Sequence, residues 1–111
     1  MSKTITVSDE LYEKLMLEHA ETLDLTGLKD LIGKSFFFRT VTYHLTGKVK
    51  KVFGSFLVLE QAAWIPDSGR FMQTILEGQI NECEPIGVAI INLSTVTDFF
   101  PWKHQLPKEQ K

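Results

Sequence analysis

The spacing of hydrophobic residues changes at Gly33 from a helical period to a strand period. Before this glycine, apolar residues such as Leu11 and Leu15 recur every three to four positions, which is typical of one face of an amphipathic helix. The pattern predicts an N-terminal helical segment over residues 8–33. Its first helix runs from Asp9 to about Glu21, and Gly33 ends a short second one.

After Gly33 the chain alternates apolar and polar positions in three runs that are separated by glycine-containing turns. This alternation predicts a meander of three antiparallel strands over residues 34–65. In the first run, Phe36 and Phe38 share one face of the strand and Phe37 lies on the other. We therefore expect this strand to be covered on both sides, or to use one face as an interface.

The remaining residues predict a helical insertion followed by two closing strands and a tail. Residues 66–87 begin with a Pro-Asp-Ser-Gly turn, continue with helical spacing and end in a polar stretch typical of a loop. Residues 88–100 are apolar and predict the closing strands. Residues 101–111 form a polar tail, which we expect to be frayed unless Trp102 packs it against the domain.

Composition places the chain among ordinary single-domain proteins. Its 111 residues, 43% of them hydrophobic, are enough to bury a core without a metal or a disulfide. Cys83 is the only cysteine and the three histidines lack metal-ligand spacing, so neither a metal nor a cofactor is expected. No apolar run is long enough to span a membrane and no secretory region follows Met1, which favours a cytoplasmic protein.

Charge is segregated along the chain although the net charge is only −2. Residues 34–59 carry five basic side chains and no acidic one, whereas residues 1–33 and 60–100 are both acidic. Blocks of one sign bear on partners more than on fold. The sequence therefore predicts one basic band on an otherwise acidic molecule.

The order of these elements resembles that of the Sm-like (LSm) family of small β-barrels. The resemblance rests on a helix that ends in Gly33-Lys34, a turn at Thr46-Gly47 that opens the second strand, and a third strand over residues 56–62. Val88 to Val96 is similar to the closing strand pair of that family. The resemblance implies a mainly β (α+β) fold. This would be an SH3-like, Sm-like five-stranded antiparallel barrel with an N-terminal helix and a short helical insertion between strands 3 and 4.

The same resemblance implies self-association but not the family's nucleotide pocket. In Sm-like rings the last strand pairs with the fourth strand of a neighbour, so we expect a homo-oligomer. RNA-binding members carry an Asp and an Asn around the start of the third strand, where this chain has Gly54-Ser55, and an Arg-Gly pair where it has Ile86-Gly87. The chain as a whole also resembles small proteins of bacteria and their phages.

The basic band supplies the candidate ligand-binding residues. Lys48 and Lys50 are expected on one face of the second strand, about 7 Å apart, which is close to the spacing of phosphates along an extended nucleic acid. Nearby aromatic residues are able to stack on a base. Alternatively, the lysines only solvate an outer strand face and discourage edge pairing. The candidate residues are Arg39, Tyr43, Lys48, Lys50, Lys51, Trp64 and Arg70.

Arg70 has two interpretations. It lies near the start of the predicted helix, where the helix dipole disfavours a cation. In the first interpretation Arg70 binds a phosphate or carboxylate of a ligand. In the second it forms a salt bridge to Asp67 or Glu77.

No catalytic motif is present, so we expect a non-enzymatic protein. Ser55 or Ser94 can be combined with His44 and Asp98 on paper, but no Gly-x-Ser-x-Gly motif supports a nucleophile. The first hypothesis is a module that binds RNA or single-stranded DNA through its lysines, with Tyr43 stacking on a base. The second is a protein-interaction or assembly subunit without nucleic acid. The third is an oligomer that binds a small nucleotide at a subunit interface, using Arg70 and Trp64.

Overall fold

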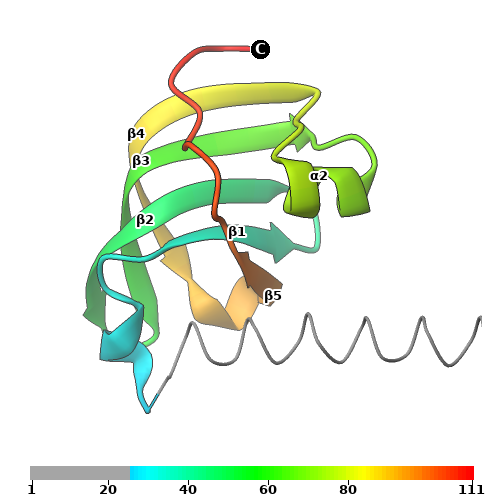
Figure 1. Cartoon of the computed structure of the whole chain (residues 1–111). Helices are drawn as coiled ribbons and strands as arrows, with labels where there is room; N and C mark the ends of the chain where they lie inside the picture. The colour runs from blue at the N-terminus through cyan, green and yellow to red at the C-terminus, as the bar shows by residue number, and fades with distance from the viewer. Residues whose placement is uncertain (1–25) are drawn as a thin grey trace, which may run out of the picture.

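The computed structural model describes residues 26–111, which form a five-stranded antiparallel sheet with one short α-helix (Figure 1). The strands are β1 (Ser35–Thr40), β2 (His44–Phe53), β3 (Phe56–Asp67), β4 (Glu82–Asn92) and β5 (Val96–Pro101). The helical elements are η1 (Leu28–Leu31), α2 (Phe71–Glu77) and η2 (Leu93–Thr95). The helix predicted from Asp9 to about Glu21 lies outside the described residues.

The strands follow the order β4-β3-β2-β1-β5 in one strongly curved sheet (Figure 1). The predicted meander is confirmed, because β1, β2 and β3 pair in sequence order, and α2 is the predicted insertion between strands 3 and 4. β4 and β5 are the two edges, and no pairing joins them within residues 26–111. Closure of this sheet into a barrel therefore stays a prediction.

A two-residue turn, Gly54-Ser55, connects β2 to β3. Phe53 pairs with Phe56 across it, and Gly54 has a φ of 56°. Tight hairpins need such a left-handed backbone because it follows the twist of the strands, and glycine adopts it without steric cost.

β1 is buried on both faces, as its three consecutive phenylalanines predict. Phe36 and Phe38 belong to a core on the concave side of the sheet, with Leu45, Leu57 and other residues of β2–β4. Phe37 points to the opposite side and belongs to a second core. All three rings are fully buried.

The insertion and the tail build the second core. The Phe37 ring stacks on Trp102 with centroids 5.8 Å apart, and Leu106 is buried in the same cluster. Gly78 ends α2 with a φ of 77°, and a Cβ there would lie 2.7 Å from the His104 ring. His104 Nε2 lies 2.8 Å from the Ile75 carbonyl oxygen and so joins the tail to the helix.

Two boundary predictions are corrected by this packing. The loop predicted to reach residue 87 ends earlier, because β4 begins at Glu82 and pairs Glu84 with Trp64. The tail is packed rather than frayed, and the main-chain groups of Lys111 and Cys83 exchange hydrogen bonds of 2.9 and 3.1 Å. Both segments are polar in sequence, but their few apolar side chains point at one sheet face.

No helix among the described residues has the length and apolar content to cross a membrane.

We expect Leu106→Ala to lower the free energy of unfolding by about 2–3 kcal/mol, because it empties part of the second core. Chemical denaturation monitored by tryptophan fluorescence measures this change. Lys108→Ala, at an exposed site in the same tail, is the control and should change stability by less than about 0.5 kcal/mol. Equal stability of the two variants would show that the tail does not contribute to the core.

Candidate functional site

The structure distributes the predicted ligand-binding residues over separate places. Tyr43 directly precedes β2 and Lys51 lies near the other end of that strand, eight residues away, which corresponds to about 26 Å along an extended chain. Trp64 lies near Tyr43, and Arg70 precedes α2. The predicted ligand-binding residues therefore divide into a lysine region, an apolar hollow and two arginines that lie apart from both.

The regular alternation of β2 is interrupted at Lys50. Val49 is buried in the concave core and Val52 packs against the same core, although the two are three residues apart. The register with β3 shifts between Val49 and Lys51, so Lys50 is the extra residue of a β-bulge. The bulge interrupts the regular pairing of β2 with β3 between Val49 and Lys51. The spacing of about 7 Å expected between Lys48 and Lys50 stays a prediction.

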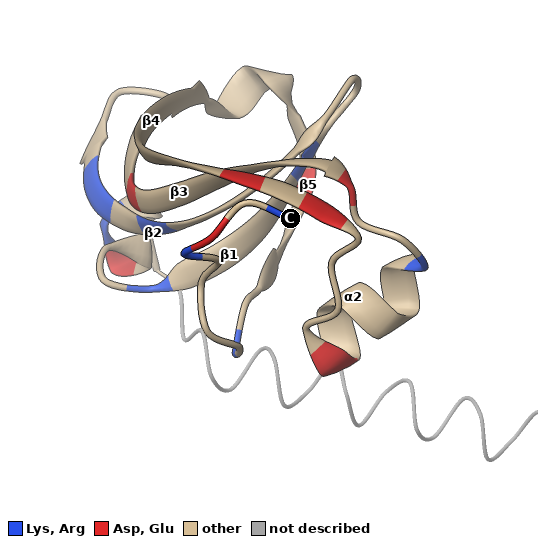
Figure 2. Cartoon of the chain, turned by 90° about the horizontal axis from the view of Figure 1, so that it is seen from above, with Lys and Arg blue, Asp and Glu red and all other residues tan. Residues whose placement is uncertain are grey.

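The bulge leaves Lys50 and Lys51 exposed, whereas Lys48 is half-buried opposite Glu60 of β3. Within residues 26–111, the one ion pair within 4 Å is Arg39–Asp98, so none of the three lysines has a paired carboxylate there. Figure 2 shows the basic stretch of β2 on one side of the sheet, away from the acidic residues of β4 and α2. Among residues 26–111, the lysines of this part of β2 thus have no ion-pair partner.

Two phenylalanines next to these lysines are binding candidates that the sequence reasoning did not identify. The rings of Phe53 and Phe56 stack with centroids 5.4 Å apart and planes inclined by 23°. Both remain exposed, by 45% and 38%. The signal in the sequence was the pair of aromatic residues flanking Gly54-Ser55, since side chains at a hairpin tip have few neighbours to cover them.

The hairpin tip is held in place by the turn between β4 and β5. Leu93 N donates a 2.8 Å hydrogen bond to the Ser55 carbonyl oxygen. The Asn92 side chain accepts hydrogen bonds from Ser94 N at 3.0 Å and from Ser94 Oγ at 2.9 Å. These hydrogen bonds therefore fix the position of the hairpin tip. We call the four residues at this end of the hairpin, Phe53, Phe56, Lys50 and Lys51, the hairpin site.

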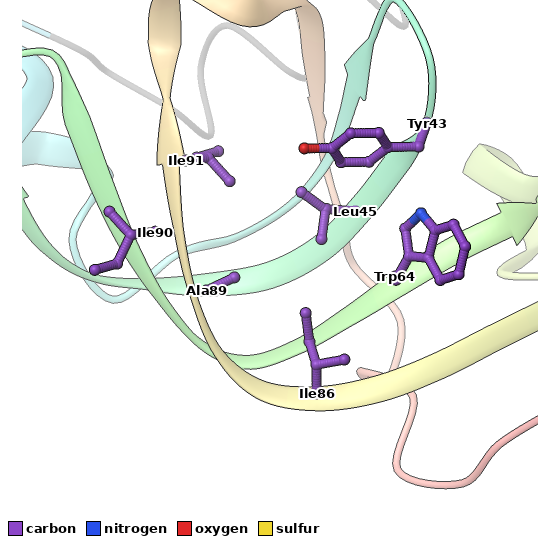
Figure 3. A pocket seen from close by; sticks show the side chains of 7 residues that line it. All are labelled: Tyr43, Leu45, Trp64, Ile86, Ala89, Ile90 and Ile91. Carbon is purple, nitrogen blue, oxygen red and sulfur yellow. The ribbon is translucent and has the colours of Figure 1, made fainter.

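At the other end of β2, Tyr43 and Trp64 line an apolar hollow of about 440 Å³ (Figure 3). The rest of its lining is Leu45 from β2 and Ile86, Ala89, Ile90 and Ile91 from β4. The hollow borders an unpaired sheet edge on which Ile86, Val88 and Ile90 are more than half exposed. No charged residue lines it, so it suits an apolar side chain better than an anion.

Arg39 is engaged in the structure and does not join the hairpin site. Its Nε donates a 2.6 Å hydrogen bond to Asp98 Oδ1, and its Nη2 pairs with Asp98 Oδ2. The guanidinium also lies 4.6 Å from the centre of the Phe71 ring. These contacts tie β1 to β5 and α2, so the guanidinium serves the fold.

The hydrogen bonds from Arg39 lower the pKa of Asp98 below its ordinary value of 3.8. The neighbouring His44 has a lowered pKa, mainly because it is partly buried and secondly because of the positive charge of Arg39. Its ring packs 5.3 Å from that of Phe37. Both effects favour the neutral imidazole, and the ring packs against Phe37 of the second core.

Arg70 directly precedes α2 and is exposed. The predicted salt bridge to Asp67 or Glu77 is absent from the described part of the chain. Asp67 instead accepts hydrogen bonds from Gly69 N at 2.9 Å and from the Asn81 side chain at 3.3 Å. Arg70 contributes to neither the hairpin site nor the apolar hollow.

No cluster of three or more His, Cys, Asp or Glu side chains suited to a metal occurs within residues 26–111. Ser55 and Ser94 stand near each other at the η2 turn, but their polar contacts involve the Leu93 main chain and the Asn92 side chain. His44 and Asp98 are involved in packing and ion pairing with other residues, as described above.

Comparison with known proteins gives likenesses at the level of fold. No family model matches the chain, and no curated protein matches it. A chain in the crystal structure of the NatC complex bound to CoA is similar at 16% identity and a TM-score of 0.51, over 71% of this chain and 88% of that one.

Two archaeal Sm structures are also similar, each at 20% identity and a TM-score of 0.46 over 67% of this chain. One is a heptameric archaeal Sm protein, of which 93% is covered, and the other is the SmAP1 heptamer of P. aerophilum, of which 85% is covered. The likeness to the chain of the NatC complex, at 16% identity, is one of fold alone. The predicted likeness to bacterial and phage proteins stays a prediction.

We expect Asp98→Asn to destabilise the protein at neutral pH by at most about 1 kcal/mol, because both partners of the ion pair are about one-third exposed. A carboxylate with a depressed pKa in the folded state stabilises the fold above its unfolded pKa. That stability is lost as the pH falls through the folded pKa. The difference in unfolding free energy between wild type and variant should therefore shrink on acidification, as measured by urea titrations at several pH values.

Glu77→Gln is the control for this titration, because Glu77 has no ion pair within the described residues. Its difference from wild type should stay small at every pH. A constant difference for Asp98→Asn across the series would contradict the assigned role of the ion pair.

Proposed function

We propose that this protein is a non-enzymatic, self-associating cytoplasmic module that binds single-stranded RNA or DNA at the hairpin site. The observation that carries the proposal is the position of two exposed, stacked phenylalanines beside two exposed lysines without partner carboxylates in residues 26–111. Aromatic faces stack on any base, and ammonium groups attract the phosphates between bases. These two chemistries together are the usual basis of single-strand binding.

The composition of the hairpin site favours a polymer over a small nucleotide. A small nucleotide needs an enclosed, polar pocket, whereas the apolar hollow has no cationic lining residue. The hairpin site lies on an exposed turn and offers a platform rather than a cavity.

The second function, assembly, is favoured by the free edge of β4. An exposed apolar edge strand presents unpaired main-chain groups and attracts another strand. Three isoleucine and valine side chains are exposed along this edge beside the apolar hollow. We propose that a second copy of the chain covers it, with its own β5 as the pairing strand, because β5 is the other free edge.

We expect the double change Lys50→Glu and Lys51→Glu to weaken binding of a fluorescein-labelled oligouridine at least about tenfold at low salt. The slope of log affinity against log salt should fall by about 1.4, since two phosphate contacts are lost. Fluorescence anisotropy over a salt series measures both quantities. Lys103→Glu with Lys108→Glu in the tail gives the same change in net charge and should leave the slope unchanged.

We expect Phe53→Ala with Phe56→Ala to cost about 1–3 kcal/mol of binding free energy per stacked base, with no change in the salt slope. Met72→Ala, at an exposed apolar residue of α2, is the control. Oligouridine binding that is insensitive to both the lysine and the phenylalanine changes would exclude the hairpin site.

We expect wild-type protein to have a mass per particle of two or more chains in light scattering, and Ile86→Glu with Ile90→Glu to reduce it. The new charges would have to be buried in the strand interface without partners. Met72→Glu adds a charge at another exposed apolar position and should leave the mass unchanged. A single-chain mass for wild type at all concentrations would refute assembly through β4.

A further inference from the structure

We propose that the acidic residues between Asp9 and Asp24 bind Lys50 and Lys51 and thereby compete with the nucleic acid at the hairpin site. This competition presupposes the nucleic-acid binding proposed above. The segment would act as an internal anionic partner that single-stranded nucleic acid has to displace.

The two parts of the chain have opposite charge. Residues 1–25 carry six acidic side chains and two lysines, whereas residues 26–111 carry ten basic and eight acidic ones. The first part therefore has a net charge of −4 and the second a net charge of +2. The acidic side chains are those of Asp9, Glu10, Glu13, Glu18, Glu21 and Asp24.

The acidic segment joins the described part of the chain close to the lysines. The Asp30 carboxylate accepts 2.7 Å hydrogen bonds from Thr26 N and Thr26 Oγ1, which fixes the residue that follows the segment. η1 is in turn attached to β2, because Gly33 N donates to the Val49 carbonyl at 2.7 Å and Val49 N to the Lys34 carbonyl at 2.9 Å. Val49 immediately precedes Lys50, so the attachment point lies beside the hairpin site.

The length of the segment is sufficient to reach the lysines. Glu21 is five residues from Thr26, which allows a span of up to about 17 Å, and the earlier acids have a longer reach. A tethered partner acts at an effective concentration near millimolar, which makes even weak ionic contacts competitive.

Apolar residues add a second element of complementarity. Leu11 and Leu15 lie among the acidic residues of the segment. Leu28 and Ile32, at η1, are 43% and 45% exposed. The acidic side chains of the segment complement the lysines in charge, and its leucines complement the exposed leucine and isoleucine of η1.

The contact can be tested without nucleic acid by the rate at which lysines are acetylated in the full-length protein, followed by mass spectrometry. The test variant combines Glu10→Gln, Glu13→Gln, Glu18→Gln and Glu21→Gln. We expect Lys50 and Lys51 to react several-fold faster in this variant than in wild type, with Lys103 unchanged. The protection in wild type should not depend on protein concentration, because the segment and the lysines belong to one chain.

The matched control combines Glu77→Gln, Glu82→Gln, Glu84→Gln and Glu109→Gln, which removes four negative charges from α2, β4 and the tail. It should leave the reactivity of Lys50 and Lys51 as in wild type. If the acetylation of Lys50 and Lys51 is accelerated equally in both variants, net charge explains the effect and the inference is overturned. Protection of these lysines that disappears on dilution would also overturn it.

Binding of the labelled oligouridine then tests the competition. We expect the N-terminal variant to bind about tenfold more tightly than the matched control at low salt. Equal affinity of the two variants, with clear binding by both, would overturn the competition. If neither variant binds oligouridine while the acetylation difference persists, the proposed nucleic-acid function fails and the internal contact stands.

Discussion

The burial of β1 on both faces is the constraint on which the rest of the structure depends. Phe36, Phe37 and Phe38 are consecutive, and in a strand consecutive side chains point to opposite faces. Three large apolar rings in a row can leave water only if both faces of the sheet are covered. The curved sheet itself covers one face, while the insertion and the tail cover the other.

This double burial also decides which part of β2 remains available for binding. The first half of β2 is buried, and Leu45 belongs to the first core. The Thr46 side chain is buried beside the second core, and its hydroxyl has no hydrogen-bond partner among the described residues. The insertion and the tail do not extend over the second half, where the bulge exposes Lys50 and Lys51. The charged part of the strand thus lies where the second core ends.

The two proposed functions use different ends of the molecule and need not exclude each other. The hairpin site stands at the far end of β2, whereas the apolar hollow lies at its start and borders the edge of β4. Nucleic acid held by lysines would leave the β4 edge free for a second copy.

The sequence by itself determined the mainly β class, the meander over residues 34–65, the helical insertion and the two-sided burial of Phe36–Phe38. These features follow from local periodicity and from glycines at turns, which need no knowledge of distant residues. The tertiary structure decided what depends on pairing between distant segments. The β-bulge at Lys50 arises from the register with β3, the partner of Arg39 is 59 residues away in β5, and the tail is packed because Trp102 meets Phe37. A basic residue looks the same in sequence whether it is paired or free. The sequence therefore predicts the same role for Arg39 and Lys50. They differ only in the residues that lie next to them in the folded protein.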